Sequence, residues 1–261
     1  KSSAEIIETY STSFGWASKL LGNSVRQQVR NIYALVRVAD EIVDGSAAEA
    51  LESLSGAHRQ PEELLNELEA ETYRAIAEGF STNLVVHAFA HTARQVGIER
   101  DIIEPFFASM RMDLHQSEHD QASFDRYVYG SAEVVGLMCL KAFVAGQNYS
   151  TQQHATMVAG ARALGAAFQK VNFLRDLAAD FKKLGRSYFP NVTVASFNET
   201  QKAALIADIE ADLMVSAQTL PLLKPSSRKA VAAAQMFFAA LNDRIRNTSA
   251  EKLIETRISV P

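Results

Sequence analysis

Apolar residues recur along this chain at the three- and four-residue spacing of amphipathic helices, and no stretch alternates apolar and polar residues like a sustained strand. Helix breakers are scarce, with 6 prolines and 12 glycines. The pattern therefore predicts an all-α protein. The expected helices cover Ser3–Leu21, Ser24–Asp44, Pro61–Glu78, Asn83–Gln95, Arg100–Ser117, Ser123–Ala145, Thr151–Phe181, Glu199–Thr219 and Pro225–Asn247.

Two loops stand out between these helices. Residues 45–60 are mostly small and polar, and Pro61 then opens the next helix at its first turn, where proline is favoured. Residues 182–190 form a basic, glycine-broken loop directly after the longest expected helix. No internal repeat or low-complexity tract is visible, so we expect a single domain over residues 1–261.

Composition narrows the class of protein. A chain of 261 residues with 48% hydrophobic content can bury a large core. A formal charge of −4 and a pI near 5.9 argue against nucleic-acid binding, which needs a basic surface. The single cysteine, Cys139, excludes an internal disulfide, and its apolar neighbours predict a packed thiol. No run of about 18 apolar residues and no signal-peptide pattern is visible, so no membrane span and a cytoplasmic location are expected.

Two acidic pairs are the most informative polar feature. Asp40 and Asp44 are four residues apart, as are Asp176 and Asp180, so each pair shares one face of a helix. Both pairs lie near the carboxyl ends of their expected helices, where the helix dipole disfavours anions. Such hard oxygen donors suit Mg²⁺, which commonly bridges protein carboxylates to substrate phosphates. The pairs therefore indicate chemistry on a phosphate or diphosphate.

Basic residues accompany both acidic pairs. Arg37 lies three residues before Asp40, and Arg175 directly precedes Asp176. One isolated pair would be interpreted as solvated surface carboxylates, but two pairs with arginines favour a site that binds Mg²⁺ and a diphosphate. Lys182 and Arg186, in the loop after the second pair, add further positive charge.

Six segments, in order along the chain, resemble the motifs of the squalene/phytoene synthases. They are Ser11–Phe14, Tyr33–Asp44, Met110–Leu114, Tyr129–Gly136, Gln169–Asp180 and Gly185–Pro190. The segment led by Tyr129 looks most like actinobacterial-type phytoene synthases. Because the six segments cover most of the chain, the resemblance is specific.

The resemblance implies an all-α isoprenoid synthase fold, with helices around a central hydrophobic cavity and both aspartate motifs at its mouth. It implies head-to-head condensation of two geranylgeranyl diphosphates to phytoene, the carotenoid precursor, through a cyclopropyl diphosphate intermediate. The cofactor would be two or three Mg²⁺ ions, with Mn²⁺ as a substitute. The partners would be prenyl diphosphate substrates, with transient contact at the inner face of a membrane and no obligate protein partner.

The resemblance also assigns residue roles. The expected catalytic residues are Asp40, Asp44, Asp176, Asp180, Tyr33, Arg37 and Tyr129. The expected substrate-binding residues are Ser11, Ser13, Phe14, Gln169, Asn172, Arg175, Lys182, Arg186 and Tyr188. The expected metal ligands are Asp40, Asp44, Asn172, Asp176 and Asp180.

Three positions depart from the family pattern or match it loosely. Glu133 stands where many relatives have glycine, and Phe238 replaces a tyrosine near the carboxyl end. Arg257 loosely matches an arginine of the last helix. No role is carried over to these residues.

Other functions stay open. Farnesyl diphosphate would give squalene or dehydrosqualene, although small residues at Ala17 and Ser18 favour a longer chain. Squalene formation requires NADPH, which is not expected because no Gly-x-Gly-x-x-Gly motif follows a strand. A non-catalytic helical protein that binds isoprenoids is the alternative of a different class, and the intact aspartates argue against it.

Two histidine pairs at helical spacing suggest a transition-metal site. They are His87 with His91 and His115 with His119. A di-iron bundle would need Glu-x-x-His on two helices, and none of the 6 histidines has glutamate three residues before it. The sequence therefore favours solvated or capping histidines.

Overall fold

A computed structural model describes residues 18–44, 60–179, 187–193, 195–256 and 258. The described part is helical, and its only strand-like feature is one isolated bridge between Glu118 and Ser187. The main helices are α3 (Asn23–Val43), α5 (Pro61–Glu78), α6 (Leu84–Val96), α7 (Arg100–His115), α8 (Gln121–Val128), α9 (Val134–Val144), α10 (Thr151–Ala179), α11 (Glu199–Ala217), α12 (Pro225–Arg246) and α13 (Ala250–Leu253). The all-α prediction is confirmed.

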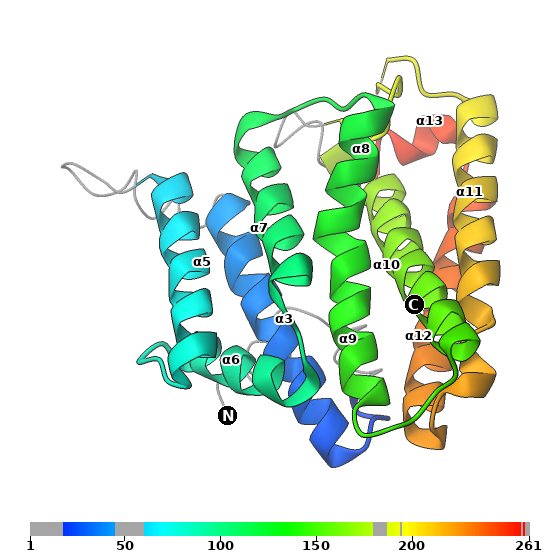
Figure 1. Ribbon diagram of the computed structural model, residues 1–261. Coiled ribbons are helices and arrows are strands. Elements are labelled where there is room, and N and C mark those ends of the chain that lie inside the picture. The colour runs from blue at the N-terminus through cyan, green and yellow to red at the C-terminus, as the bar shows by residue number, and fades with distance from the viewer. Residues whose placement is uncertain (1–17, 45–59, 180–186, 194, 257, 259–261) are drawn as a thin grey trace.

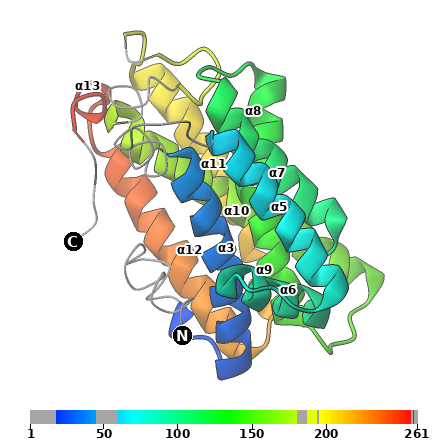
Figure 2. The same cartoon turned by 90° about the vertical axis from the view of Figure 1, so that its left-hand side faces the viewer.

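The helices surround two hydrophobic clusters. One cluster includes Ile32, Phe89 and Phe106 and lies among α3, α5, α6, α7 and α9. The other includes Leu174 and Ile206 and lies among α8, α10, α11, α12 and α13. Figure 1 shows the α8–α9 rod between these two groups, and Figure 2 shows the same bundle from its side. The rod therefore separates a first half of the fold from a second half.

Helix ends follow the expected local chemistry. Pro61 opens α5 next to a capping box formed by Gln60 and Glu63. Asn83 caps α6 by accepting hydrogen bonds from two backbone N–H groups, at 3.1 and 3.3 Å. The α5 helix stops at Gly79, whose φ of 83° is a left-handed conformation that glycine adopts without strain. These ends agree with the predicted boundaries to within a residue or two.

One π-helical turn interrupts the central rod. The sequence predicts one helix over Ser123–Ala145, whereas residues Tyr129–Glu133 form a π-turn between α8 and α9. At this turn the rod touches its neighbours with backbone atoms. A Cβ on Gly130 would lie 2.1 Å from the carbonyl oxygen of Pro105, and a Cβ on Gly165 would lie 2.4 Å from that of Ala132. The π-turn is therefore held between α7 and α10.

Other differences from the predicted elements are small. A 3₁₀ turn at Leu220–Leu222 follows α11, and the short helix α13 was not expected. Most of the expected helix Ser3–Leu21 lies outside the described residues, as do residues 180–186, where the longest helix was expected to end.

The segment Gln121–Val144 was tested against the expectation that no membrane span is encoded. It is the one helical stretch of the described chain that is long and apolar enough to cross a membrane, with a mean hydropathy of 1.3. Its π-turn and α9 pack directly on α7 and α10. We therefore interpret it as the central helix of the bundle.

The single cysteine lies on α9. Cys139 is partly buried and packs against a small cluster formed by Leu21, Val29 and Ala230. Burial raises the pKa of its thiol to about 12. The predicted packed thiol is confirmed.

The two helices that carry the acidic motifs run toward the same end of the molecule. The carboxyl ends of α3 and α10 both lie toward the top of Figures 1 and 2. The two motifs thus come from different halves of the fold but from one end of the bundle.

Candidate active site

The first acidic pair lies in the last turn of α3. Asp44 is the C-cap of the helix, and its backbone N–H donates to the carbonyl of Asp40 at 2.8 Å. Asp40 is half-buried and Asp44 is exposed. Arg37, one turn earlier, forms an ion pair with Glu41 on the same helix. The α3 helix therefore brings a guanidinium and three carboxylates to one end of the bundle.

The environment of Asp40 opposes its negative charge. Burial, followed by the charge of Asp44, raises the pKa of the Asp40 carboxyl from 3.8 to about 7. Arg37 lowers this pKa, but Asp113 and Glu41 raise it further. The positive charge of Arg37 therefore does not offset burial and the neighbouring carboxylates. Binding of a cation would relieve the repulsion and favour the ionised form.

Asp113 of α7 adds a buried carboxylate to this group. It is 8% exposed, and it accepts hydrogen bonds from the hydroxyls of Tyr127 at 2.8 Å and Tyr188 at 3.3 Å. Burial raises the pKa of Tyr127 well above its ordinary value, and the charge of Asp113 raises it further, so this hydroxyl keeps its proton. Two donated hydrogen bonds therefore hold this carboxylate in place.

The second acidic motif lies at the end of α10. Arg175 forms an ion pair with its neighbour Asp176, with Nε 3.0 Å from Oδ1. Asn172 lies one turn before Asp176 on the same face, and its Oδ1 is buried without a hydrogen-bond partner. Gln169 lies a further turn back and is half-buried. An oxygen with no donor is available as a ligand for a cation.

Aromatic contacts connect the two halves of the site. The ring of Tyr188 stacks on that of Phe173, with centroids 4.0 Å apart and planes at 9°. Phe173 lies on α10, three residues before Asp176, while the Tyr188 hydroxyl reaches Asp113 on α7. Tyr188 is 8% exposed. The structure thus shows Tyr188 as a buried link, and its predicted contact with substrate stays a prediction.

The two predicted catalytic tyrosines occupy different surroundings. Tyr33 lies on α3 one turn before Arg37, close enough to favour the charged form of that guanidinium. Tyr129 lies in the π-turn, where the Arg162 guanidinium covers its ring at 5.2 Å. Arg162 also donates to Glu133 at 2.6 Å, so the residue that departs from the family pattern is ion-paired.

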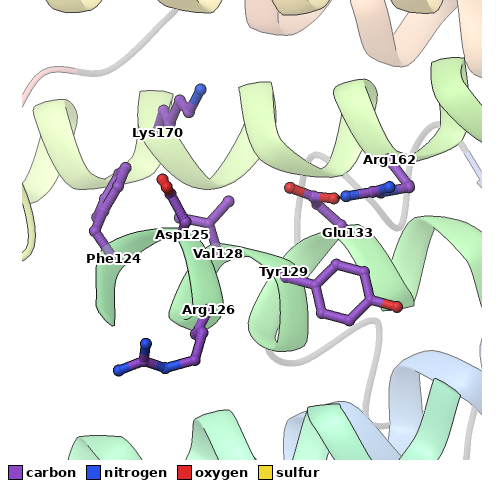
Figure 3. A pocket seen from close by; sticks show the side chains of 8 residues that line it. All are labelled: Phe124, Asp125, Arg126, Val128, Tyr129, Glu133, Arg162 and Lys170. Carbon is purple, nitrogen blue, oxygen red and sulfur yellow. Dashed lines mark hydrogen bonds and ion pairs between the residues drawn. The ribbon is translucent and has the colours of Figure 1, made fainter. Parts of the chain in front are cut away.

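Figure 3 shows Tyr129, Glu133 and Arg162 lining a pocket of about 470 Å³ between α8, the π-turn and α10. Lys170 lines the same pocket and pairs with Asp208 at 2.5 Å and Asp212 at 2.8 Å on α11. None of Asp40, Asp113 and Asp176 lines it. Tyr129 therefore lines a pocket to which these three acidic residues do not contribute.

Some predicted site residues lie outside the described residues. They are Ser11, Ser13, Phe14, Asp180, Lys182 and Arg186. Their roles stay predictions.

Two residues near the site carried no predicted role. They are Asp113 and Tyr127. Tyr127 donates a hydrogen bond to Asp113, and the charge of Asp113 acts on Asp40. Asp113 lies inside the Met110–Leu114 segment, and Tyr127 lies two residues before the tyrosine that was chosen. That nearby segment is the signal that could have identified them.

The described groups fit a divalent cation. The carboxylates of α3 repel one another, and Asn172 of α10 offers an unpaired oxygen. Oxygen donors of both kinds are ligands that Mg²⁺ accepts. Within the described ranges no three His, Cys, Asp or Glu side chains already converge as a metal site. One of the predicted ligands, Asp180, falls outside those ranges.

The fold and these groups define an all-α protein of the isoprenoid synthase type, with acidic helix ends suited to a divalent cation. Residues 7–261 match the family described as squalene/phytoene synthase, so the chain belongs to this family. Members of the family join two prenyl diphosphates head to head.

Curated relatives include phytoene and diapophytoene synthases. The chain is 30% identical to a 15-cis-phytoene synthase of Pantoea ananas, over 71% of this chain and 58% of the relative. It is 25% identical to a 4,4'-diapophytoene synthase of Staphylococcus haemolyticus, over 74% of this chain and 63% of the relative. The alignments thus span less than two thirds of these relatives.

Solved structures share the fold. A dehydrosqualene synthase with a bound ligand matches with a TM-score of 0.76 at 23% identity, over 94% of this chain and 85% of that one. The squalene synthase HpnC from Alicyclobacillus acidocaldarius matches with a TM-score of 0.75 at 17% identity, over 94% of each chain. At these identities the likeness supports the fold alone.

Proposed function

We propose that this chain is a Mg²⁺-dependent prenyltransferase that condenses two geranylgeranyl diphosphates head to head to phytoene. The observation that carries the proposal is the match of residues 7–261 to the squalene/phytoene synthases, in a chain whose helix α3 ends in the carboxylates Asp40 and Asp44. A carboxylate group with excess negative charge at the end of a helix serves stability poorly. It serves the binding of a cation and its diphosphate well.

The residues have distinct tasks in the proposed reaction. Asp40, Asp44 and Asp176, with Asp180 and the Asn172 oxygen, would hold the ions. Bound Mg²⁺ supplies Lewis acidity that stabilises the departing diphosphate. Arg37 and Arg175 would exchange their present carboxylate partners for diphosphate oxygens, because guanidinium groups bind both in the same forked geometry.

Departure of one diphosphate leaves an allylic cation, which the double bond of the second substrate attacks. Loss of a proton closes the cyclopropyl diphosphate intermediate. A second ionisation, rearrangement and proton loss give the linear product. No side-chain nucleophile is required, and electrostatic stabilisation of the leaving group is the main catalytic contribution.

Substrate length separates the leading proposal from its alternatives. The 15-cis-phytoene synthases among the relatives favour the twenty-carbon substrate. The 4,4'-diapophytoene synthase keeps dehydrosqualene or squalene formation from farnesyl diphosphate as the second candidate. We expect no NADPH requirement, and transient membrane contact stays a prediction that rests on the apolar product.

The test is direct. The purified protein is incubated with Mg²⁺ and either the fifteen- or the twenty-carbon diphosphate, with and without NADPH, and the hydrocarbon is identified by mass spectrometry. We expect phytoene from the twenty-carbon substrate and no product after chelation of Mg²⁺. The folded variant Asp176→Asn serves as the negative control. Release of no diphosphate from either substrate would support the non-catalytic, isoprenoid-binding alternative.

A further inference from the structure

A buried histidine lies beside the two tyrosines that bind Asp113. His119 is 8% exposed, and its Nδ1 is buried without a hydrogen-bond partner. The sequence-based interpretation of this residue as a solvated or capping histidine was therefore wrong. Burial of a polar atom without a partner costs stability, so a compensating role for this ring is expected.

The His119 ring packs on two tyrosines. It stacks on Tyr188 with centroids 5.9 Å apart and planes at 17°, and it lies 5.2 Å from the Tyr127 ring at 47°. Tyr188 also stacks on Phe173 of α10. The plane of each tyrosine is thus restricted by aromatic neighbours, and His119 contacts both.

Both tyrosine hydroxyls converge on one carboxylate. Tyr127 donates to Oδ2 of Asp113 and Tyr188 donates to Oδ1, at 2.8 and 3.3 Å. Because a phenol hydroxyl lies in the plane of its ring, the ring orientation sets where each proton points. The ring contacts of His119 therefore bear on the position of the Asp113 carboxylate.

The backbone around His119 supports the same arrangement. The N–H of Ser187 donates to the carbonyl of Ser117 at 2.8 Å, and Glu118 forms a parallel bridge with Ser187. Residues 117–119 and 187–188 are therefore tied by backbone contacts as well as by ring stacking. This unit connects the start of α8 to the end of α10.

We propose that His119 is a positioning residue, whose ring holds Tyr127 and Tyr188 so that Asp113 stays fixed beside Asp40 and strengthens cation binding there. The inference rests on the proposed function, because it concerns the same cation. Helix α7, which carries Asp113, packs directly on α3, which carries Asp40, and the charge of Asp113 acts on the Asp40 carboxyl. If Asp113 moved away, the negative charge near Asp40 would fall and cation binding would weaken, although every proposed ligand would remain.

The test replaces the ring and measures metal binding directly. His119→Leu fills a similar volume without a flat ring, His119→Phe restores a ring, and His115→Ala is the matched control. His115 is 59% exposed and contacts Glu62 at 3.2 Å, away from the tyrosines. Mn²⁺ binding is followed by electron paramagnetic resonance in the presence of inorganic pyrophosphate, on variants whose folding is checked by circular dichroism.

We expect His119→Leu to weaken Mn²⁺ binding about tenfold, the lower end of the range for residues that orient metal ligands. His119→Phe should recover most of this loss, and His115→Ala should bind like the unaltered protein. In turnover, His119→Leu should raise the Mg²⁺ concentration for half-maximal rate more than the KM of the prenyl diphosphate.

Two outcomes separate the inference from the proposed function. Unchanged Mn²⁺ binding in folded His119→Leu, with only a lower free energy of unfolding, would show a merely structural role and overturn the inference alone. Absence of Mn²⁺ binding in the unaltered protein would overturn the proposed function, and the inference with it.

Discussion

Among the individual residues, ionised Asp40 lowers the stability of the fold but is the form that the proposed cation binding needs. Its pKa is raised to about 7 from 3.8, first by burial and then by Asp44. Protonated Asp40 therefore favours the folded state below about pH 4, and this contribution is lost as the pH rises from 3.8 through 7. A chain that retains such a carboxylate gives up stability at neutral pH where the ion is absent.

Asp40→Asn should separate the two effects. Without Mg²⁺ at pH 8, it should raise the free energy of unfolding by on the order of 1–2 kcal/mol, a value discounted for partial exposure. At pH 4 the variant and the original should be equal. Turnover should fall at least about 10²-fold. Urea unfolding at both pH values measures the first effect, with Asp243→Asn as the control, because that side chain is 65% exposed. Equal stability gains at both pH values would contradict this account.

The sequence predicted candidate site residues within single helix turns but assigned no role to Asp113 and Tyr127, which meet across helices. Spacing alone identified Asp40 and Asp44, because residues four apart share a helix face. Tyr127 and Tyr129, two residues apart, point to different sides of their helix. Which of them meets Asp113 depends on how α7 packs against the rod, and the local sequence contains no such information.

Among the secondary-structure elements, the glycine contacts of the central rod are the most restrictive feature. Gly165 of α10 faces the backbone of Ala132 in the π-turn. Backbone atoms cannot shift as a flexible side chain can, so this approach requires a residue without Cβ. The contact sets the distance between the rod and α10.

Gly165→Ala should therefore destabilise the fold. The new Cβ would lie 2.4 Å from the Ala132 carbonyl oxygen, and overpacking of this kind costs about 1–3 kcal/mol. Gly22→Ala is the matched control, because its Cβ would lie 3.7 Å from Ser226 Oγ, an ordinary contact. At that N-cap the loss should be no more than about 1 kcal/mol. Equal urea unfolding midpoints for the two variants would show that α10 can move away from the rod.

Helix positions were predictable from sequence, and the π-turn was not. Proline at a helix start and glycine at a helix end are local signals, and Pro61 and Gly79 lie at the ends of α5. The residues of Tyr129–Glu133 carry no comparable signal. The π-turn is held by contacts with Pro105 on α7 and with Gly165 on α10, and both of these residues are distant in sequence.

For the whole molecule, the acidic groups come from helices of both hydrophobic clusters. Asp40 belongs to α3 in the first half, and Asp176 belongs to α10 in the second. A metal–diphosphate complex held by both helices would bind the folded state alone. Mass action then predicts that it stabilises the fold as a unit.

Mg²⁺ and inorganic pyrophosphate together should raise the Tm by more than the sum of their separate effects. At 100 times the dissociation constant the gain is about 2.7 kcal/mol, or several degrees for a chain of this size. Differential scanning calorimetry measures it, and chelation of Mg²⁺ should reverse it. The variant Asp40→Asn with Asp176→Asn should lose the synergy. Purely additive shifts in the unaltered protein would contradict joint binding.

The thiol of Cys139 can report on local opening of the helix bundle. Cys139 has a pKa of about 12 and packs against Leu21, Val29 and Ala230, so alkylating reagents meet a protonated, shielded sulfur in the closed bundle. Separation of α9 from α3 and α12 would expose this partly buried side chain further and speed its labelling. The labelling rate therefore reports on opening at the end of the bundle opposite the acidic groups, without an engineered probe.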